Sequence, residues 1–145
     1  MKLNWKRSFP LMPAPCWTSN MTFSKHAKRY LLLALIWSVF LLFLSIQPAD
    51  KVEIFLPFDL LASLAHAAVY FILAALLCLA LRFWKYSILS VVLVSFIYAV
   101  VWGIVNELVQ FYEPTRSPSV SDVISDAIGA ALAISLFIWW RKRSM

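Results

Sequence analysis

This sequence of 145 residues contains only two glycines, two cysteines and 14% charged residues. With Gly103 and Gly129 as its only glycines, the chain has no glycine-rich loop that could cradle a phosphate, and it is not collagen-like or of low complexity. Cys78 lies inside an apolar run and Cys16 in a basic segment. Neither has the spacing of metal ligands, and we expect no disulfide between them.

Apolar residues dominate instead. Hydrophobic residues make up 63% of the chain, and its mean hydropathy is +0.81. These values lie well above those of an ordinary soluble domain. The length is sufficient for one compact unit and too short for two ordinary domains. The composition therefore indicates a single membrane domain.

The net charge of +6 is divided unevenly along the chain. Three regions carry lysine and arginine without any acid, whereas the acids occupy the two other connections or the helix ends next to them. This segregation is typical of the positive-inside rule and does not indicate a nucleic-acid-binding surface. It places both termini in the cytoplasm. The three basic regions contain Lys2, Lys6, Arg7, Lys25, Lys28 and Arg29; Arg82 and Lys85; and Arg141, Lys142 and Arg143.

Four apolar runs are long enough to cross a bilayer as helices, at about 30–46, 60–81, 87–109 and 123–140. We therefore predict an all-α fold, a four-helix transmembrane bundle that occupies residues 30–145. We expect the tryptophans to lie in the interfacial belts.

Residues 1–29 are basic and contain three prolines, so we predict a flexible cytoplasmic tail. Met21 is a candidate true start, because the residues after it already supply the basic flank of the first helix. In the connection after the first helix, residues 54–56 are apolar and are expected to lie in the membrane interface.

Polar residues gather between residues 106 and 129, where two apolar runs flank them. Ionisable groups at the rim of a membrane segment are costly unless they are paired, so they indicate a functional site. By the predicted topology, four separate segments bring polar groups to one outer level. These groups are His66 and Tyr70, four residues apart; Glu107 and Gln110, three apart; Arg116 in the connection; and Asp122 and Asp126 in the last helix.

Small residues predict where helices approach one another closely. Ser125, Gly129 and Ala133 are spaced by four in the last helix and form a ridge that another helix can contact. Gly103 lies one turn below Glu107 on the same face. The spacing of Ser119 and Asp122 is typical of a helix start. We assign all four small residues to packing.

The order Glu107-x-x-Gln110, Arg116, Asp122-x-x-x-Asp126-x-x-Gly129 resembles the signature of the VanZ-like family of small membrane proteins. His66-x-x-x-Tyr70-Phe71 is similar to the histidine motif of that family. The resemblance covers about residues 50–133. It implies an integral protein of the bacterial cytoplasmic membrane, and the family name implies a link to glycopeptide antibiotic resistance. The family usually has asparagine where this chain has Asp126, and an Asp-Lys pair closer to the histidine.

Each polar residue has a structural and a functional interpretation. Glu107 and Arg116 form either a structural ion pair or a headgroup pocket in which Arg116 grips phosphate. His66 is either a neutral, hydrogen-bonded imidazole or a proton shuttle and general base. Asp122 is expected to interact with the helix dipole. Asp126 is either protonated or paired with Arg116 or His66.

Three classes of function remain open from the sequence. The first is a protein that binds an envelope lipid or a lipid-linked cell-wall precursor, or that modulates a membrane-protein partner. The second is an enzyme that acts on a lipid-linked or peptidoglycan-related substrate, and the third is a small transporter or channel subunit. We assign no catalytic residue and expect no cofactor. A metal site at His66, Glu107 and Asp126 has no supporting metal-binding motif.

Overall fold

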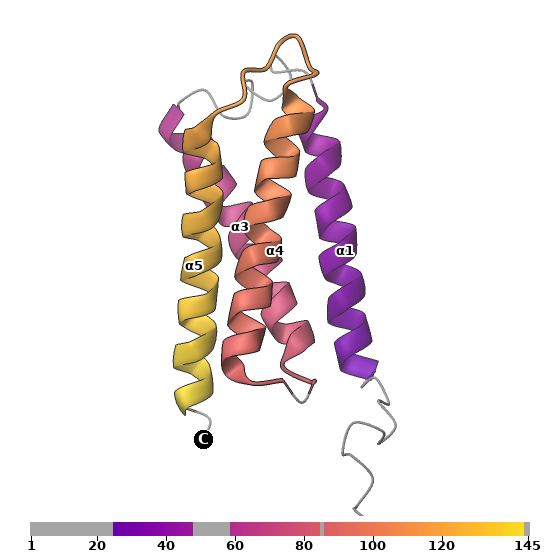
Figure 1. The fold of residues 1–145 in the computed structure, drawn as a ribbon, viewed down its shortest axis with the longest axis vertical. Helices are drawn as coiled ribbons and strands as arrows, with labels where there is room; N and C mark the ends of the chain where they lie inside the picture. Colours follow the sequence, from indigo (N-terminus) through magenta and orange to yellow (C-terminus); the bar gives the residue numbers. More distant parts are fainter. Residues whose placement is uncertain (1–24, 48–58, 85, 144–145) are drawn as a thin grey trace, which may run out of the picture.

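The computed structural model describes residues 25–47, 59–84 and 86–143, and these residues form four α-helices (Figure 1). The helices are α1 (Lys25–Ser45), α3 (Asp59–Leu81), α4 (Ile88–Gln110) and α5 (Val120–Arg143). Each contains a segment long and apolar enough to cross a membrane. The prediction of an all-α bundle with four membrane-spanning helices is confirmed.

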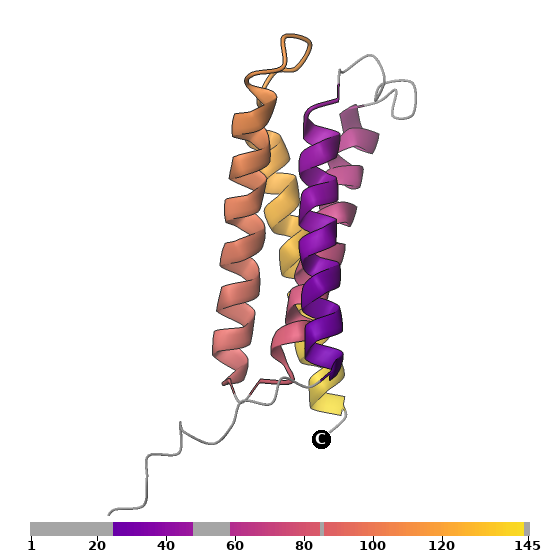
Figure 2. The same ribbon diagram turned by 90° about the vertical axis from the view of Figure 1, so that its right-hand side faces the viewer.

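Consecutive helices run in opposite directions, so the start of α1 and the end of α5 lie at the same end of the bundle (Figure 1). Helix α3 contacts each of the other three helices, and its contact with α5 is the most extensive. Helix α1 packs on α3 and α4 and does not reach α5, as the two views show (Figures 1 and 2). The helices α3 and α4 therefore form the central pair of the bundle, and α1 and α5 each pack against both of them.

The helix boundaries differ from the predicted ones at the starts of α1 and α5 and at the end of α5, which lies at Arg143 instead of residue 140. Helix α1 begins at Lys25, so residues 25–29, which we assigned to the tail, are helical. Helix α5 begins at Val120 instead of residue 123, directly after Ser119, whose hydroxyl accepts a hydrogen bond from the Ser121 amide at 3.2 Å. Residues 1–24 and 48–58 lie outside the described residues, so the flexible tail, the start at Met21 and the interfacial position of residues 54–56 stay predictions.

The core of the bundle is rich in small side chains, and many large apolar side chains face outward. Leu32, Val39, Leu89 and Leu108 are among the exposed large side chains. This inversion is expected when lipid surrounds the protein, because apolar helices then associate through close packing of small residues. The buried small residues are Ala27, Ala34, Ser38, Ser45, Ala74, Cys78, Ala80, Ser95, Ala99, Gly103, Gly129, Ala130 and Ala133.

The helices α3 and α5 approach each other closely at Gly129. A methyl group added there would lie 1.9 Å from the carbonyl oxygen of Ala67. Only a residue without a side chain allows the two backbones to come this near. One turn further along α5, Ala133 is also buried in the core. Because His66 precedes Ala67, this contact also determines where the His66 side chain lies relative to α5.

Two tryptophans do not occupy the interfacial belt that we predicted. Trp37 and Trp102 lie well inside α1 and α4 and are half-buried. The indole of Trp37 donates a hydrogen bond to the Val69 carbonyl at 2.9 Å, and that of Trp102 donates to the Ser38 carbonyl at 3.1 Å. An indole N–H needs an acceptor when it is buried, and a carbonyl on a neighbouring helix supplies it. These two bonds join α1 to α3 and α4.

Candidate functional site

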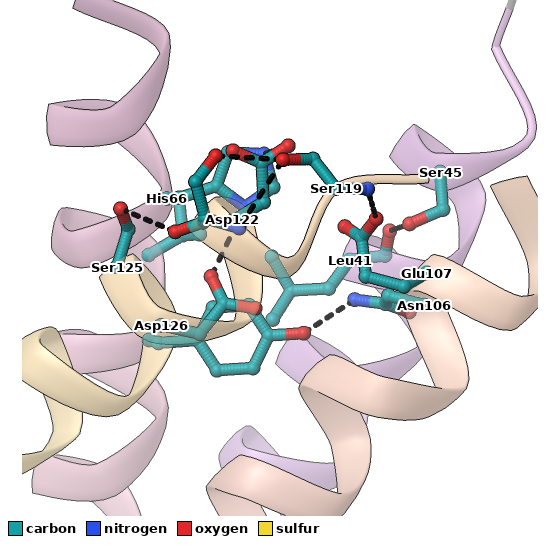
Figure 3. Close-up of polar contacts among 12 residues, drawn as sticks. Leu41, Ser45, His66, Asn106, Glu107, Ser119, Asp122, Ser125 and Asp126 are labelled. Carbon is teal, nitrogen blue, oxygen red and sulfur yellow. Dashed lines mark hydrogen bonds and ion pairs between the residues drawn. The ribbon is translucent and has the colours of Figure 1, made fainter. Parts of the chain in front are cut away.

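His66 on α3 lies between two carboxylates of α5 (Figure 3). Its Nδ1 is 3.0 Å from Asp126 Oδ1, and its Nε2 is 4.0 Å from Asp122 Oδ2. An ionised carboxylate only accepts hydrogen bonds, so with Asp126 ionised Nδ1 is the donor in the shorter contact. The side chains of His66 and Asp122 are 25% and 24% exposed, whereas that of Asp126 is 1% exposed. Asp126 is therefore the buried member of the three, which we call the floor of the site, and the other two lie nearer the surface, at what we call its mouth.

Tyr70 and Asn106 connect α3 to α4 below this pair. The side-chain amide of Asn106 donates to the Tyr70 hydroxyl at 2.6 Å, and both residues are buried. Tyr70 lies one turn from His66 on the same face of α3. A second polar contact therefore adjoins the histidine–aspartate pair inside the bundle.

Glu107, the residue after Asn106, holds the connection between α4 and α5. Its Oε2 accepts a hydrogen bond of 2.8 Å from the backbone amide of Ser119 (Figure 3). In a capping box this amide would bond to the acid three residues later, Asp122. Here Glu107 supplies the acceptor from a neighbouring helix, while the Asp122 carboxylate lies near His66. The start of α5 is thereby tied to α4.

Gly103 makes room for Asp126 on the α4 side of the site. A methyl group added at Gly103 would lie 2.7 Å from Asp126 Oδ2. Oδ1 of the same carboxylate is bonded to His66. Asp126 therefore bridges the space between α3 and α4, with one oxygen directed to each helix.

Arg116 does not pair with Glu107 or Asp126, although all three are described. Its Nε donates to the backbone carbonyl of Gln47 at 3.1 Å, just beyond the end of α1. Of the three alternatives for Asp126, pairing with His66 is the one that the geometry supports. Arg116 links the α4–α5 connection to α1, and we no longer count it among the groups that surround Asp126.

The other residues that we predicted for the site or for packing lie nearby. Gln110 is buried at the end of α4. Ser125 is half-buried, and its hydroxyl donates to the Ser121 carbonyl within α5 at 3.0 Å. The small-residue ridge is therefore buried at Gly129 and Ala133 and reaches the surface at Ser125.

Within the described part of the chain, no group of three His, Cys, Asp or Glu side chains is arranged to hold a metal ion. His66, Asp126 and Glu107, which we considered as ligands, are directed to different partners: the first two to each other and the third to the Ser119 amide. The chemistry that the site offers is hydrogen bonding and charge, from one imidazole, three carboxylates and an amide.

Sequence reasoning missed two participants. Asn106 precedes Glu107, and we did not assign it a role, although its spacing of three from Gly103 places both on one face. The backbone amide of Ser119 carries no sequence signal of its own. Its contact with Glu107 depends on how the connection folds back over the end of α4 (Figure 3).

The fold and the site together define a multi-pass membrane protein whose polar groups are concentrated at one end of an apolar bundle. The model of the VanZ/LLP1 family matches residues 17–141, which is 125 of the 145 residues. The chain therefore belongs to the VanZ/LLP1 family. Neither the curated proteins nor the solved structures yield a match to it.

Proposed function

We propose that this protein binds the polar headgroup of a membrane lipid, or of a lipid-linked cell-wall precursor, between α3, α4 and α5. The observation that most supports this function is the graded burial of the site, from Asp122 near the mouth to Asp126 at the floor. A headgroup can enter such a site from the membrane surface while its acyl chains stay in the bilayer.

The depth of the site agrees with this function. Asp126 lies six residues after the start of α5, about 9 Å along the helix axis. His66 lies seven residues after the start of α3, about 10 Å along it. We place the helix starts in the headgroup region, which puts both positions near the boundary between headgroups and acyl chains.

Lipid analysis of purified protein tests this proposal. The protein is extracted in a mild detergent, and the lipids that co-purify are compared with the bulk membrane extract by native mass spectrometry. We expect one lipid class to be enriched on the wild type and lost from the double variant His66→Gln, Asp126→Asn, which keeps hydrogen-bonding groups and removes the ionisable ones.

Glu113→Gln is the matched control, because Glu113 lies on the α4–α5 connection and bonds to Thr115 instead of the site. It should retain the enriched lipid. Equal lipid content on all three proteins would contradict the proposal. Glycopeptide susceptibility of cells that carry the same variants is the physiological readout, because sequestering a cell-wall-related headgroup would change access of the antibiotic to its target.

An enzyme is the second candidate, and the His66–Asp126 contact is the observation that favours it. An aspartate that holds Nδ1 of a histidine leaves Nε2 available as a general base. The same preparation tests this candidate: a lipid-linked substrate should be converted over time, and His66→Gln should abolish the conversion. A transporter has less support, because the buried polar groups of the described residues farther from this end of the bundle are the serines Ser38 and Ser95.

A further inference from the structure

Three buried oxygen atoms around the site have no hydrogen-bond partner in the described part of the chain. They are Asn106 Oδ1, Glu107 Oε1 and Asp126 Oδ2. Their side chains are only 5%, 6% and 1% exposed. A buried polar atom without a partner is costly, and each such atom in a folded protein requires an explanation.

The side chains that carry these oxygens are held in place by their other polar atoms. Asn106 donates to Tyr70, Glu107 Oε2 accepts from the Ser119 amide, and Asp126 Oδ1 contacts His66. Rotation of the Glu107 or Asp126 carboxylate would only exchange the bonded oxygen for the free one. With the Asn106 amide donating to Tyr70, each of the three side chains therefore keeps one oxygen without a partner.

The three oxygens belong to residues that surround one region of the bundle, next to Gly103. Asn106 and Glu107 are neighbours on α4, one turn from Gly103, and Asp126 Oδ2 lies against Gly103 from the side of α5. Residues one turn apart on a helix have their Cβ atoms about 5–6 Å apart. Tyr70, bonded to Asn106, borders the same region from α3.

The chemistry of the three oxygens selects the kind of group that completes the site. All three accept hydrogen bonds, and two of them belong to carboxylates. A primary ammonium group has three N–H donors, no acceptor and a positive charge, so it matches them in number and in sign. A phosphate or carboxylate has only acceptors and would be repelled, and a trimethylammonium group has no N–H to donate.

We propose that the site binds the primary ammonium group of its ligand, with Asn106 Oδ1, Glu107 Oε1 and Asp126 Oδ2 as the acceptors. This inference rests on the proposed function and names the part of the headgroup that reaches the floor of the site. The ammonium group belongs either to an ethanolamine-type lipid headgroup or to a water-soluble amine. In both cases the N–H groups of the ammonium donate hydrogen bonds to the three free oxygens.

Binding to a series of matched lipids tests the inference on the full-length wild type. The probes are phosphatidylethanolamine, its N-acetylated derivative, phosphatidylcholine and phosphatidylglycerol, all with the same acyl chains, titrated and followed by native mass spectrometry. We expect phosphatidylethanolamine to bind about tenfold more tightly than the other three, because charge-assisted hydrogen bonds are lost in each of them.

Variants locate the binding. Glu107→Gln and Asp126→Asn should each weaken phosphatidylethanolamine binding about tenfold. Glu113→Gln should bind as the wild type does, because it removes a charge from the same end of the bundle without touching the site. Tryptophan-fluorescence unfolding checks that the variants are folded, and the lipid series on the wild type remains decisive if they are not.

Competition with free ethanolamine identifies the source of the ammonium group. Displacement of phosphatidylethanolamine by millimolar ethanolamine would indicate a soluble amine, and resistance to it would indicate the lipid headgroup.

Equal binding of all four lipids, or a preference for phosphatidylglycerol, would overturn the inference. The proposed function would still stand if that binding were lost in the His66→Gln, Asp126→Asn variant. If no lipid bound at the site, both would fail.

Discussion

The two ends of the bundle place their charged side chains in different surroundings. At the end that contains the site, Glu107 and Asp126 are buried and hydrogen-bonded to neighbouring elements. At the opposite end, Arg82 lies over the rings of Phe83 and Trp140, 4.7 and 4.8 Å from their centroids. Arginine has a long apolar stem and can remain near water, whereas a carboxylate this deep in the bundle needs partners within the protein.

This difference separates an end suited to anchoring the protein from the end at which we propose that a ligand binds. Cations stacked on aromatic rings are expected at a membrane interface and need no ligand to complete them. Each of the two buried acids, in contrast, has one oxygen that accepts no hydrogen bond from any described residue. Labelling and substitutions at both ends test how far the two ends differ.

The orientation of the bundle gives an all-or-none result. In a chain with Cys16→Ser and Cys78→Ala, we expect a membrane-impermeant maleimide to label Ser117→Cys on intact cells but Tyr86→Cys only after permeabilisation. Both positions are exposed and lie at opposite ends of the bundle. The reason is the positive-inside rule, which places the basic end in the cytoplasm. The reverse labelling pattern would show that the basic end faces outward and that the predicted orientation is wrong.

Loss of the histidine should have the largest effect on stability. His66→Leu leaves the buried Asp126 without its partner, and we expect a loss of about 3 kcal/mol in the free energy of unfolding. Unfolding in detergent, followed by tryptophan fluorescence, measures it. Adding Asp126→Asn to His66→Leu should restore part of the loss, since no unpaired charge then remains. A double variant no more stable than His66→Leu would show that the charge is not the cause.

Gly129→Ala should cost about 2 kcal/mol by the same measurement. The added methyl group meets the backbone of Ala67 at 1.9 Å, and backbone cannot move aside as a flexible side chain can. The helices α3 and α5 must therefore separate. A variant as stable as the wild type would contradict the close approach of these two helices.

Gly103→Ala should cost less, about 1 kcal/mol, because the added methyl group meets the end of the Asp126 side chain, which can rotate. The rotation should disturb the contact with His66, so we expect this variant to lose lipid binding while it stays folded. The two glycines thus separate packing from binding. Unchanged lipid binding in Gly103→Ala would argue that Asp126 is not a ligand contact.

Arg82→Gln should have the smallest effect, below about 1 kcal/mol, because it removes cation–π contacts at a partly exposed site. Lipid binding at the opposite end should not change. A loss comparable to that of His66→Leu would mean that the two ends do not differ as we describe.

Much of the fold could be predicted because the relevant signals are local. Apolar runs of sufficient length identified all four spans, and the ends of α3 and α4 lie within one residue of the predicted positions. The starts of α1 and α5 were less well predicted, because basic and polar residues continue these helices beyond their apolar parts.

The sequence predicted which residues belong to the candidate site better than it predicted their contacts. Helical spacing placed His66 with Tyr70 and Asp122 with Asp126, and the expected turn of the chain brought the two pairs to one end. Spacing could not indicate that Arg116 would bond to Gln47, nor that Asn106 would bond to Tyr70. Those contacts depend on the rotation of one helix against another.

By itself, the sequence determined the number of spans, the separation of acidic from basic ends and the set of polar residues near one rim. Each of these properties follows from hydropathy and charge along the chain. Only the tertiary structure decided that Asp126 pairs with His66, that Glu107 bonds to the Ser119 amide and that three oxygens remain free. The reason is that close contact at Gly129 sets the position of α3 against α5. The spacing of residues within one helix does not indicate how that helix packs against another.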